Sequence, residues 1–249
     1  MNLAYRTILP LAGLIILLVF SLALNYFLVK RYRQAYREWS RVTLDPLALE
    51  QPPALPDNGA NGRLVLFYGD SRAAAWPEPA DSEGFVFVNG GVNGQTAVQM
   101  NLRYAAAAAP LQPDIVVVQV GINDLRVIPA LPDQKEAIIA ATADNIRQIV
   151  SQATAGGATV IVTTIFPVQT PPWTEQMFWS DEVRGGITAV NHAIQSLAGE
   201  NVLVLDAYAL LADEQGVLRS EFAADYLHIN ANGYYELNQL LRAYLLQLS

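Results

Sequence analysis

From Arg63 onward, short apolar segments alternate with longer segments that mix apolar and polar residues. The apolar segments are nearly continuous, which is typical of strands that are buried on both faces. They lie at residues 64–68, 85–88, 115–120, 159–165 and 202–205. Between and after them, residues 96–109, 133–155, 181–197 and 232–248 have the pattern and length of helices. Strands that alternate with helices predict a parallel sheet covered by helices on both sides.

The N-terminal segment follows a different pattern. Between Arg6 and Lys30 lie 23 residues without a charge, enough for a helix to cross a hydrocarbon core of about 30 Å. We therefore interpret residues 8–29 as a transmembrane helix that acts as a signal anchor, preceded by an N-terminal tail at residues 1–7. The alternative is a cleaved signal peptide, because Ser21-Leu22-Ala23 offers small residues of the kind found at cleavage sites.

Residues 30–62 connect this helix to the remainder of the chain. The segment begins with a basic juxtamembrane part and continues as a stretch with little apolar periodicity, typical of a linker. Its proline and glycine residues are Pro46, Pro52, Pro53, Pro56, Gly59 and Gly62. The folded domain is therefore predicted at residues 63–249, a length that buries a substantial core.

Charge is distributed unequally between these parts. Residues 1–41 contain six basic residues and Glu38 as their one acidic residue, which leaves 9 of the 15 basic and 22 of the 23 acidic residues for the rest, a net charge of −13. So acidic a domain repels phosphates, and we expect no nucleic-acid partner. The basic cluster directly after the apolar segment fits contact with lipid headgroups.

The flanking charges also bear on topology. Five basic residues follow the predicted span, whereas only Arg6 and the amino terminus precede it, so the positive-inside bias favours a cytoplasmic domain. Long domains are exported despite unfavourable flanks, which leaves the side open. The chain has no cysteine, which excludes disulfide bonds and a thiol nucleophile.

Four short blocks carry the candidate chemistry, and three of them stand at or just after the carboxyl end of a predicted strand. The blocks are Gly69-Asp70-Ser71, residues 89–96, Gly121-Ile122-Asn123-Asp124 and Asp225-Tyr226-Leu227-His228. In open α/β sheets, ligands bind beyond the carboxyl ends of the strands. The placement of the blocks therefore predicts a site at this edge of the sheet.

Ser71 and His228 are the candidate nucleophile and base. A serine where a buried strand turns into a loop or a helix exposes its hydroxyl, and an imidazole within hydrogen-bond reach accepts its proton. A carboxylate as close as Asp225 can hold that ring in the productive tautomer. Each residue alone also fits an ordinary role, Ser71 as a helix cap and His228 as a solvated residue beside a helix capped by Asn230 or Asn232.

Asn123 and Gly94 are candidate donors to an oxyanion. The Asn123 side-chain amide follows a buried strand, and the Gly94 backbone N–H lies near a predicted helix start, where such groups are free. The glycine-rich segment 89–96 lacks both the Gly-Lys-Ser/Thr ending of phosphate loops and the Gly-x-Gly-x-x-Gly spacing of dinucleotide sites. His192 lies inside a predicted helix without a partnered pattern, and we expect it on the surface.

The four blocks resemble those of the SGNH hydrolases, also called GDSL-type esterases and lipases, over residues 64 to about 245. The resemblance implies an α/β protein, a three-layer α/β/α sandwich with a five-stranded parallel sheet (flavodoxin-like), and a serine esterase mechanism without metal or organic cofactor. It also implies Ser71 as the nucleophile, His228 as the base and Asp225 as its orienter. The oxyanion donors would be Ser71 N–H, Gly94 and Asn123. Resemblance to secreted and envelope hydrolases favours an extracytoplasmic domain.

The chain departs from the family pattern at Arg72, where many members carry a small or apolar residue. We expect a cation at the border of the site that either binds an anionic substrate or pairs with Asp124. Asp70, Asp124 and Arg72 are expected to support the site. The aromatic segment 166–179 is a candidate lid or pocket wall, or alternatively a hydrophobic patch packed on the domain or against the membrane.

Together these features predict a membrane-anchored serine esterase that hydrolyses carboxylic esters through an acyl-enzyme intermediate. Its expected partners are a small-molecule, lipid or carbohydrate ester and the membrane. One alternative is an O-acyltransferase or deacetylase acting on cell-envelope carbohydrate, suggested by the anchor and by tryptophans able to stack on sugar rings. A non-catalytic binding module on the same fold is another. The sequence leaves the acyl chain, the alcohol and the oligomeric state open.

Overall fold

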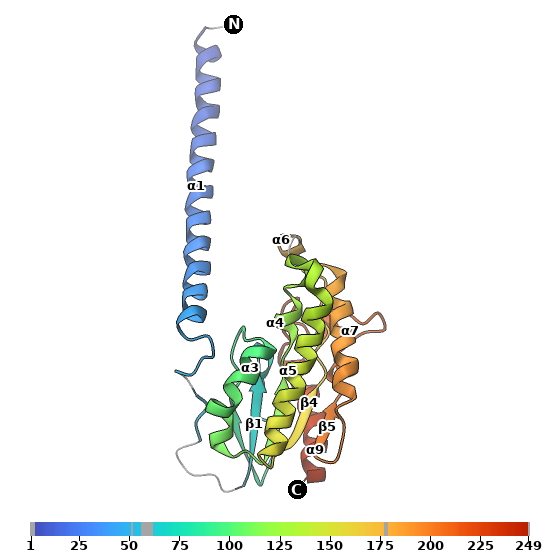
Figure 1. Ribbon diagram of the computed structural model, residues 1–249. Coiled ribbons are helices and arrows are strands. Elements are labelled where there is room, and N and C mark those ends of the chain that lie inside the picture. The colour runs from blue at the N-terminus through green and yellow to red at the C-terminus, as the bar shows by residue number, and fades with distance from the viewer. Residues whose placement is uncertain (1–2, 51, 56–61, 177–178, 249) are drawn as a thin grey trace. The chain divides into compact units, whose positions relative to one another are not determined.

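The computed structural model describes residues 3–50, 52–55, 62–176 and 179–248 (Figure 1). The chain divides into two compact units, Met1–Pro46 and Leu47–Ser249. The first unit is dominated by α1 (Leu3–Leu44). Within the described residues, α1 is the one helix long and apolar enough to cross a membrane, a test that a signal sequence near the N-terminus also passes.

The helix α1 continues through the basic segment instead of ending where the apolar run ends. The rings of Tyr32 and Tyr36 lie 6.3 Å apart, and those of Tyr36 and Trp39 lie 5.9 Å apart. Side chains three and four residues apart meet on one helix face, so these contacts support the helical form. The juxtamembrane part is thus helical, and the predicted linker falls partly outside the described residues, at residues 51 and 56–61.

The second unit is built on a five-stranded parallel sheet, as predicted. The strands are β1 (Arg63–Gly69), β2 (Phe85–Asn89), β3 (Ile115–Gln119), β4 (Thr159–Thr163) and β5 (Val202–Leu205). Their order is β2-β1-β3-β4-β5, which is the flavodoxin-like arrangement. The chain passes from β1 to β2 on one side of β1 and then crosses to β3 on the other side. Where two connections leave a strand in opposite directions like this, a crevice forms at the carboxyl ends of the strands, and ligands bind there.

Helices cover both faces of the sheet and complete the three layers. The helices of this unit are α2 (Ser71–Ala74), α3 (Ala97–Arg103), α4 (Ile122–Leu125), α5 (Lys135–Ala155), α6 (Trp173–Gln176), α7 (Asp181–Gln195), α8 (Ala207–Leu211) and α9 (Ala231–Leu248), of which α6 buries no residue. Short 3₁₀ turns lie at Ala109–Leu111, Ile128–Ala130, Pro132–Gln134 and Ser220–Phe222. On one face of the sheet, side chains from α3, α5 and α7 form the core, and on the other face those from α8 and α9 do.

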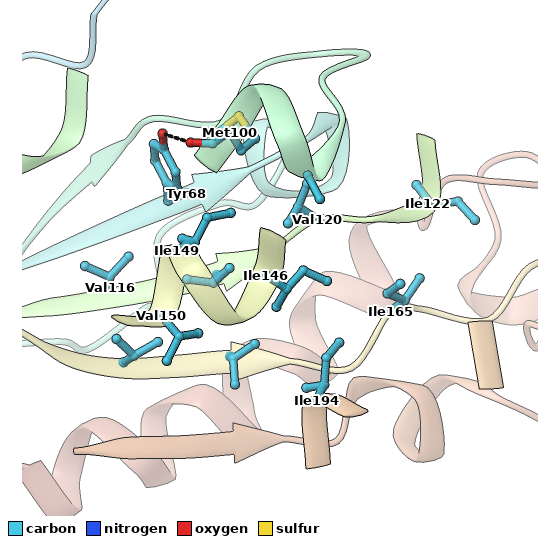
Figure 2. Packing of buried hydrophobic residues seen from close by; sticks show 14 of the residues in the cluster. Tyr68, Met100, Val116, Val120, Ile122, Ile146, Ile149, Val150, Ile165 and Ile194 are labelled. Atoms are coloured by element: carbon cyan, nitrogen blue, oxygen red, sulfur yellow. Dashed lines mark hydrogen bonds between the residues drawn. The ribbon is translucent and has the colours of Figure 1, made fainter. Parts of the chain in front are cut away.

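Figure 2 shows the core on the face covered by α3 and α5. Val116 of β3 packs with Ile146 and Ile149 of α5, and all three side chains are buried. The Tyr68 hydroxyl donates a hydrogen bond of 2.8 Å to the Met100 carbonyl oxygen. A buried hydroxyl needs such a partner, and this bond ties the end of β1 to α3.

The helix predicted at 96–109 and the strand predicted at 159–165 differ from the observed elements. The helix predicted at 96–109 changes at Tyr104 into a π-helical turn, Tyr104–Ala108, before Pro110 interrupts it. The strand predicted at 159–165 ends at Thr163 because Asn191 of α7 takes the place of a neighbouring strand. Its side-chain oxygen accepts from Ile165 N at 2.7 Å, and its side-chain nitrogen donates to Ile165 O at 3.0 Å.

Candidate active site

Ser71 is the first residue of α2, directly after β1. The turn is tight, since a Cβ on Gly69 would lie 1.7 Å from the backbone oxygen of Gln119. Asp70 caps the helix by accepting a 2.9 Å hydrogen bond from Arg72 N. Because the first N–H groups of a helix lack helical partners, this turn presents both the Ser71 hydroxyl and its backbone N–H at the sheet edge.

His228 lies in the loop before α9 and reaches Ser71 from the far end of the sequence. Its Nε2 is 3.1 Å from Ser71 Oγ, and its Nδ1 is 2.8 Å from Asp225 Oδ2. The other oxygen of Asp225 accepts hydrogen bonds from Leu227 N and His228 N, each 2.7 Å long. The structure thus brings the predicted nucleophile, base and orienting carboxylate together in one hydrogen-bonded row.

The electrostatics of Asp225 suit an orienting role. Partial burial opposes its ionisation, but hydrogen bonds from the His228 ring and from the backbone N–H groups of His228 and Leu227 outweigh it and lower its pKa. The carboxylate is therefore ionised at neutral pH. An ionised acceptor at Nδ1 favours the tautomer in which Nε2 faces Ser71 as a proton acceptor.

The block at residues 89–96 packs against the nucleophile turn. The Asn89 side chain donates to the carbonyl oxygens of Ala73, Ala74 and Trp76 at 3.0, 3.2 and 3.3 Å. A Cβ on Gly91 would lie 2.2 Å from Ala74 N, so the two segments approach more closely than a side chain would permit. Asn89 therefore caps the C-terminal end of α2, a role that the sequence alone did not reveal.

Gly94 and Asn123 lie on two segments that are joined by hydrogen bonds. Gly94 has a φ of +77°, a conformation that favours glycine. The Asn123 side chain donates a 2.9 Å hydrogen bond to the carbonyl oxygen of Gln95, the residue after Gly94. An amide nitrogen carries two N–H groups, so this bond orients the Asn123 side chain and uses only one of its donors.

Asp124 holds the start of α3 in the same region. Its Oδ2 accepts a 2.8 Å hydrogen bond from Ala97 N. Burial raises the pKa of Asp124 to about 7 and that of Asp70 to about 6. The Asp70 charge adds to the increase for Asp124, while Arg72 moderates that of Asp70. Both carboxyl groups thus hold backbone around the site, and both titrate closer to neutrality than ordinary carboxylates.

The expectation that Arg72 borders the site as an accessible cation is wrong. Its side chain has no solvent exposure, which removes it from contact with a dissolved anion. Its guanidinium donates to the carbonyl oxygens of Leu227 and Phe166 instead of pairing with Asp124. The arginine points into the molecule because the turn of α2 carries it beneath the Asp225–His228 loop.

The aromatic segment at 166–179 is partly core and partly a wall beside the His228 loop. Phe166 and Val168 are buried, and Gln169 N donates a 2.8 Å hydrogen bond to the carbonyl oxygen of Tyr226. Trp179 meets the Tyr226 ring edge to face, with centroids 5.9 Å apart. These contacts fix the wall to the loop that carries the base. Part of the predicted lid, at residues 177–178, lies outside the described residues.

Tyr226 also connects the base loop to the asparagine block. Its hydroxyl is 3.2 Å from a guanidinium nitrogen of Arg126, which follows Asn123 by one helical turn. Neither Arg126 nor Tyr226 stood out in the sequence, because their proximity depends on the fold. His192 is exposed on α7, as expected.

The fold and the site together define an α/β protein with a serine, a histidine and an aspartate in hydrogen-bond contact at the carboxyl edge of its sheet. The chain belongs to the GDSL-like lipase/acylhydrolase family, whose model matches residues 55–235. This membership confirms the resemblance found in the sequence. No curated protein matches the chain.

Solved structures share the fold. A GDSL-like lipase from Bacteroides thetaiotaomicron is 22% identical with a TM-score of 0.62, and the match covers 85% of this chain and 98% of the lipase. An acetylxylan esterase from Geobacillus stearothermophilus is 19% identical with a TM-score of 0.54, and the match covers 74% of this chain and 94% of the esterase. At these identities the likeness is one of fold.

Proposed function

We propose that this protein is a serine esterase that hydrolyses carboxylic esters through an acyl-enzyme intermediate. The observation that carries the proposal is the pair of hydrogen bonds from Ser71 Oγ to His228 Nε2, 3.1 Å, and from His228 Nδ1 to Asp225, 2.8 Å. A serine hydroxyl is a weak nucleophile near neutral pH, and contact with a base is what activates it. Membership of the GDSL-like family supports an ester as the substrate.

In the first half of the reaction, Ser71 Oγ bonds to the carbonyl carbon of the ester while His228 Nε2 takes its proton. The negative charge that develops on the carbonyl oxygen is received by the N–H groups of Ser71 and Gly94 and by the Asn123 amide. Asp225 stabilises the imidazolium. The bond to the alcohol oxygen then breaks, and the proton on Nε2 passes to this leaving group, which departs as the alcohol.

In the second half, water takes the place of the alcohol. His228 Nε2 removes a proton from the water as its oxygen bonds to the acyl carbon. The tetrahedral intermediate collapses, Ser71 Oγ recovers its proton from His228, and the carboxylic acid leaves. The same three side chains thus serve both acylation and deacylation.

The test is turnover of short p-nitrophenyl esters by the full chain. We expect Ser71→Ala and His228→Ala to lower kcat by roughly 10⁴- to 10⁶-fold, and Asn123→Ala by roughly 10²- to 10³-fold. Ser151→Ala, on the exposed side of α5, is the matched control and should match the wild type. Activity retained in Ser71→Ala would reject the assignment. Failure of a fluorophosphonate probe to label Ser71 would favour the non-catalytic binding module.

An esterified carbohydrate is the second candidate substrate, and exposed tryptophan favours it. Trp173, on α6, is 82% exposed. Figure 1 shows α6 beyond the carboxyl ends of the strands, the end toward which the β1 arrow points. An aromatic face can pack on a sugar ring while its edge stays in water. The similarity to an acetylxylan esterase supports this candidate.

Product analysis separates hydrolysis from transfer to a sugar hydroxyl. With an acetylated xylo-oligosaccharide and a glycan acceptor, an esterase yields acetate and the deacetylated oligosaccharide and leaves the acceptor unmodified, whereas an acyltransferase yields acetylated acceptor. Trp173→Ala should raise KM for the oligosaccharide and leave KM for p-nitrophenyl acetate unchanged. If the variant and the wild type have equal KM values on both substrates, Trp173 does not stack on a sugar ring of the substrate.

We further propose that α1 anchors the protein in a membrane. The length and apolar composition of α1 support the anchor, and the basic residues that follow the apolar run suit lipid headgroups. Alkaline carbonate extraction should leave the full-length chain in the membrane pellet, whereas a cleaved signal would give a shorter, soluble product. Because the chain has no cysteine, Glu83→Cys introduces a single thiol, and labelling of intact cells by an impermeant maleimide reports which side holds the domain.

A further inference from the structure

The buried arginine next to the nucleophile is bonded to the loop that carries the base. The Nε and Nη2 atoms of Arg72 donate to the Leu227 carbonyl oxygen at 3.1 and 2.7 Å, and Nη1 donates to the Phe166 carbonyl oxygen at 3.2 Å. Its guanidinium carbon lies 5.2 Å from the centroid of the Phe166 ring. The side chain is completely buried, so water does not compete for these bonds.

These bonds connect the residue next to the nucleophile with the residue next to the base. Arg72 follows Ser71 in the chain, and Leu227 precedes His228. The guanidinium therefore spans the gap between the nucleophile turn and the base loop with one rigid, planar group. Two donors on one carbonyl oxygen fix the position of that oxygen more firmly than a single donor would.

The backbone of Arg72 is itself held on both sides. Its N–H donates to Asp70 Oδ1 at 2.9 Å, and its carbonyl oxygen accepts a 2.8 Å hydrogen bond from the Tyr234 hydroxyl of α9. The arginine is thus a fixed support from which the loop is held. By contrast, two side chains of the loop reach solvent, since those of His228 and Asp225 are 38% and 51% exposed, whereas Leu227 is buried.

We propose that Arg72 is a positioning residue, which sets the distance between Ser71 Oγ and His228 Nε2 by holding the Leu227 carbonyl. The inference rests on the proposed function, because it assigns a role in the same reaction. Arg72 touches neither substrate nor the reacting atoms, and it acts through the placement of His228.

The expected effect is a loss of kcat with little change in KM. Displacing a reacting group by about 1 Å can cost about 10²-fold in rate. Arg72→Met keeps an apolar stem and removes every side-chain donor, and we expect its kcat to fall about 10²-fold. Arg72→Lys keeps the charge but offers a point donor in place of the planar fork, so it should recover part of the loss. Arg72→Lys also provides the measurement if Arg72→Met does not fold.

A double-mutant cycle with His228→Ala distinguishes positioning from a general structural role. If Arg72 acts through His228, the Arg72 variant should lose little further activity once the imidazole is absent. Arg103→Met is the matched control, since Arg103 is also fully buried and donates to the carbonyl oxygens of Gly90 and Ala48. Its effect on kcat should be the same with and without His228. An equal loss for the Arg72 variant in both backgrounds would overturn the inference.

A readout without turnover separates this inference from the proposed function. The chain has two histidines, so the ¹⁵N NMR signal of His228 Nε2, the atom that faces Ser71 Oγ, can be assigned in the full chain, with exposed His192 as reference. We expect this signal to shift in the Arg72 variants and to stay at its wild-type position in Arg103→Met. An unchanged signal in a folded Arg72 variant overturns the inference, while absence of esterase activity in the wild type overturns only the proposed function.

Discussion

Replacing Asp225 by asparagine tests how the base is oriented. Oδ1 of Asp225 accepts from two backbone N–H groups at 2.7 Å, and Oδ2 faces His228 Nδ1 at 2.8 Å. In Asp225→Asn the amide oxygen is needed by the backbone groups, so the amide nitrogen faces Nδ1. A donor there favours the tautomer with its proton on Nε2, which cannot accept the proton of Ser71.

The size of the effect follows from charge and exposure. A carboxylate about 4 Å from the imidazolium stabilises it by about 1 kcal/mol in bulk water and by about 4 kcal/mol at an effective dielectric constant of about 20. With side chains 38% and 51% exposed, solvent screening places the pair near the lower value. Together with the unfavourable tautomer, we expect kcat to fall about 10²- to 10³-fold, less than the roughly 10⁴-fold found for a buried carboxylate in a serine protease.

The assay is kcat and KM for p-nitrophenyl acetate, with KM expected to stay near the wild-type value. Asp213→Asn is the matched control, because Asp213 accepts from the backbone N–H groups of Gln215 and Val217 at 2.9 and 2.8 Å but has no histidine partner. It should retain wild-type kcat. An Asp225→Asn variant with more than about a third of wild-type kcat would refute both the tautomer argument and the electrostatic one.

Two further predictions concern stability. In Gly69→Ala the new Cβ would lie 1.7 Å from the Gln119 backbone oxygen, so we expect a loss at or above the roughly 1–3 kcal/mol typical of overpacking. Thermal unfolding should show this loss of stability as a lower melting temperature. In the control Gly185→Ala, on α7, the new Cβ would meet no atom within 4 Å, and we expect it to stabilise the protein by about 0.5–1 kcal/mol. Equal melting temperatures for the two variants would contradict the packing argument. Burial raises the pKa of Asp124 from 3.8 to about 7, so the folded state holds the proton of this carboxyl group more tightly than the unfolded state does. The contribution of that proton to the free energy of unfolding is complete below pH 3.8 and is lost as the pH rises through about 7. Asp124→Asn removes this dependence, and its stability relative to the wild type should increase between about pH 4 and about pH 8 in denaturant titrations; a constant difference would show that Asp124 does not titrate in this range.

The sequence predicted the layers of the domain because burial on both faces leaves a direct pattern. Strands such as β3, Ile115–Gln119, are entirely buried, and no polar residue is tolerated along most of their length. The short helices α2, α4 and α8 were not predicted, since helices of four or five residues are too short to show periodicity. The early end of β4 depends on Asn191, a side chain that is distant in sequence.

For the site, the sequence by itself supplied the residue types and their order, and the family motif assigned Ser71, His228 and Asp225 their expected roles. Only the tertiary structure decided which groups touch: the 3.1 Å contact of Ser71 with His228 closes a separation of 157 residues. Arg72 shows the difference most directly, because a charged residue in the sequence suggested exposure, whereas the fold buries it among carbonyl oxygens. A side chain's chemistry is local, but its partners and its access to solvent depend on packing between distant segments.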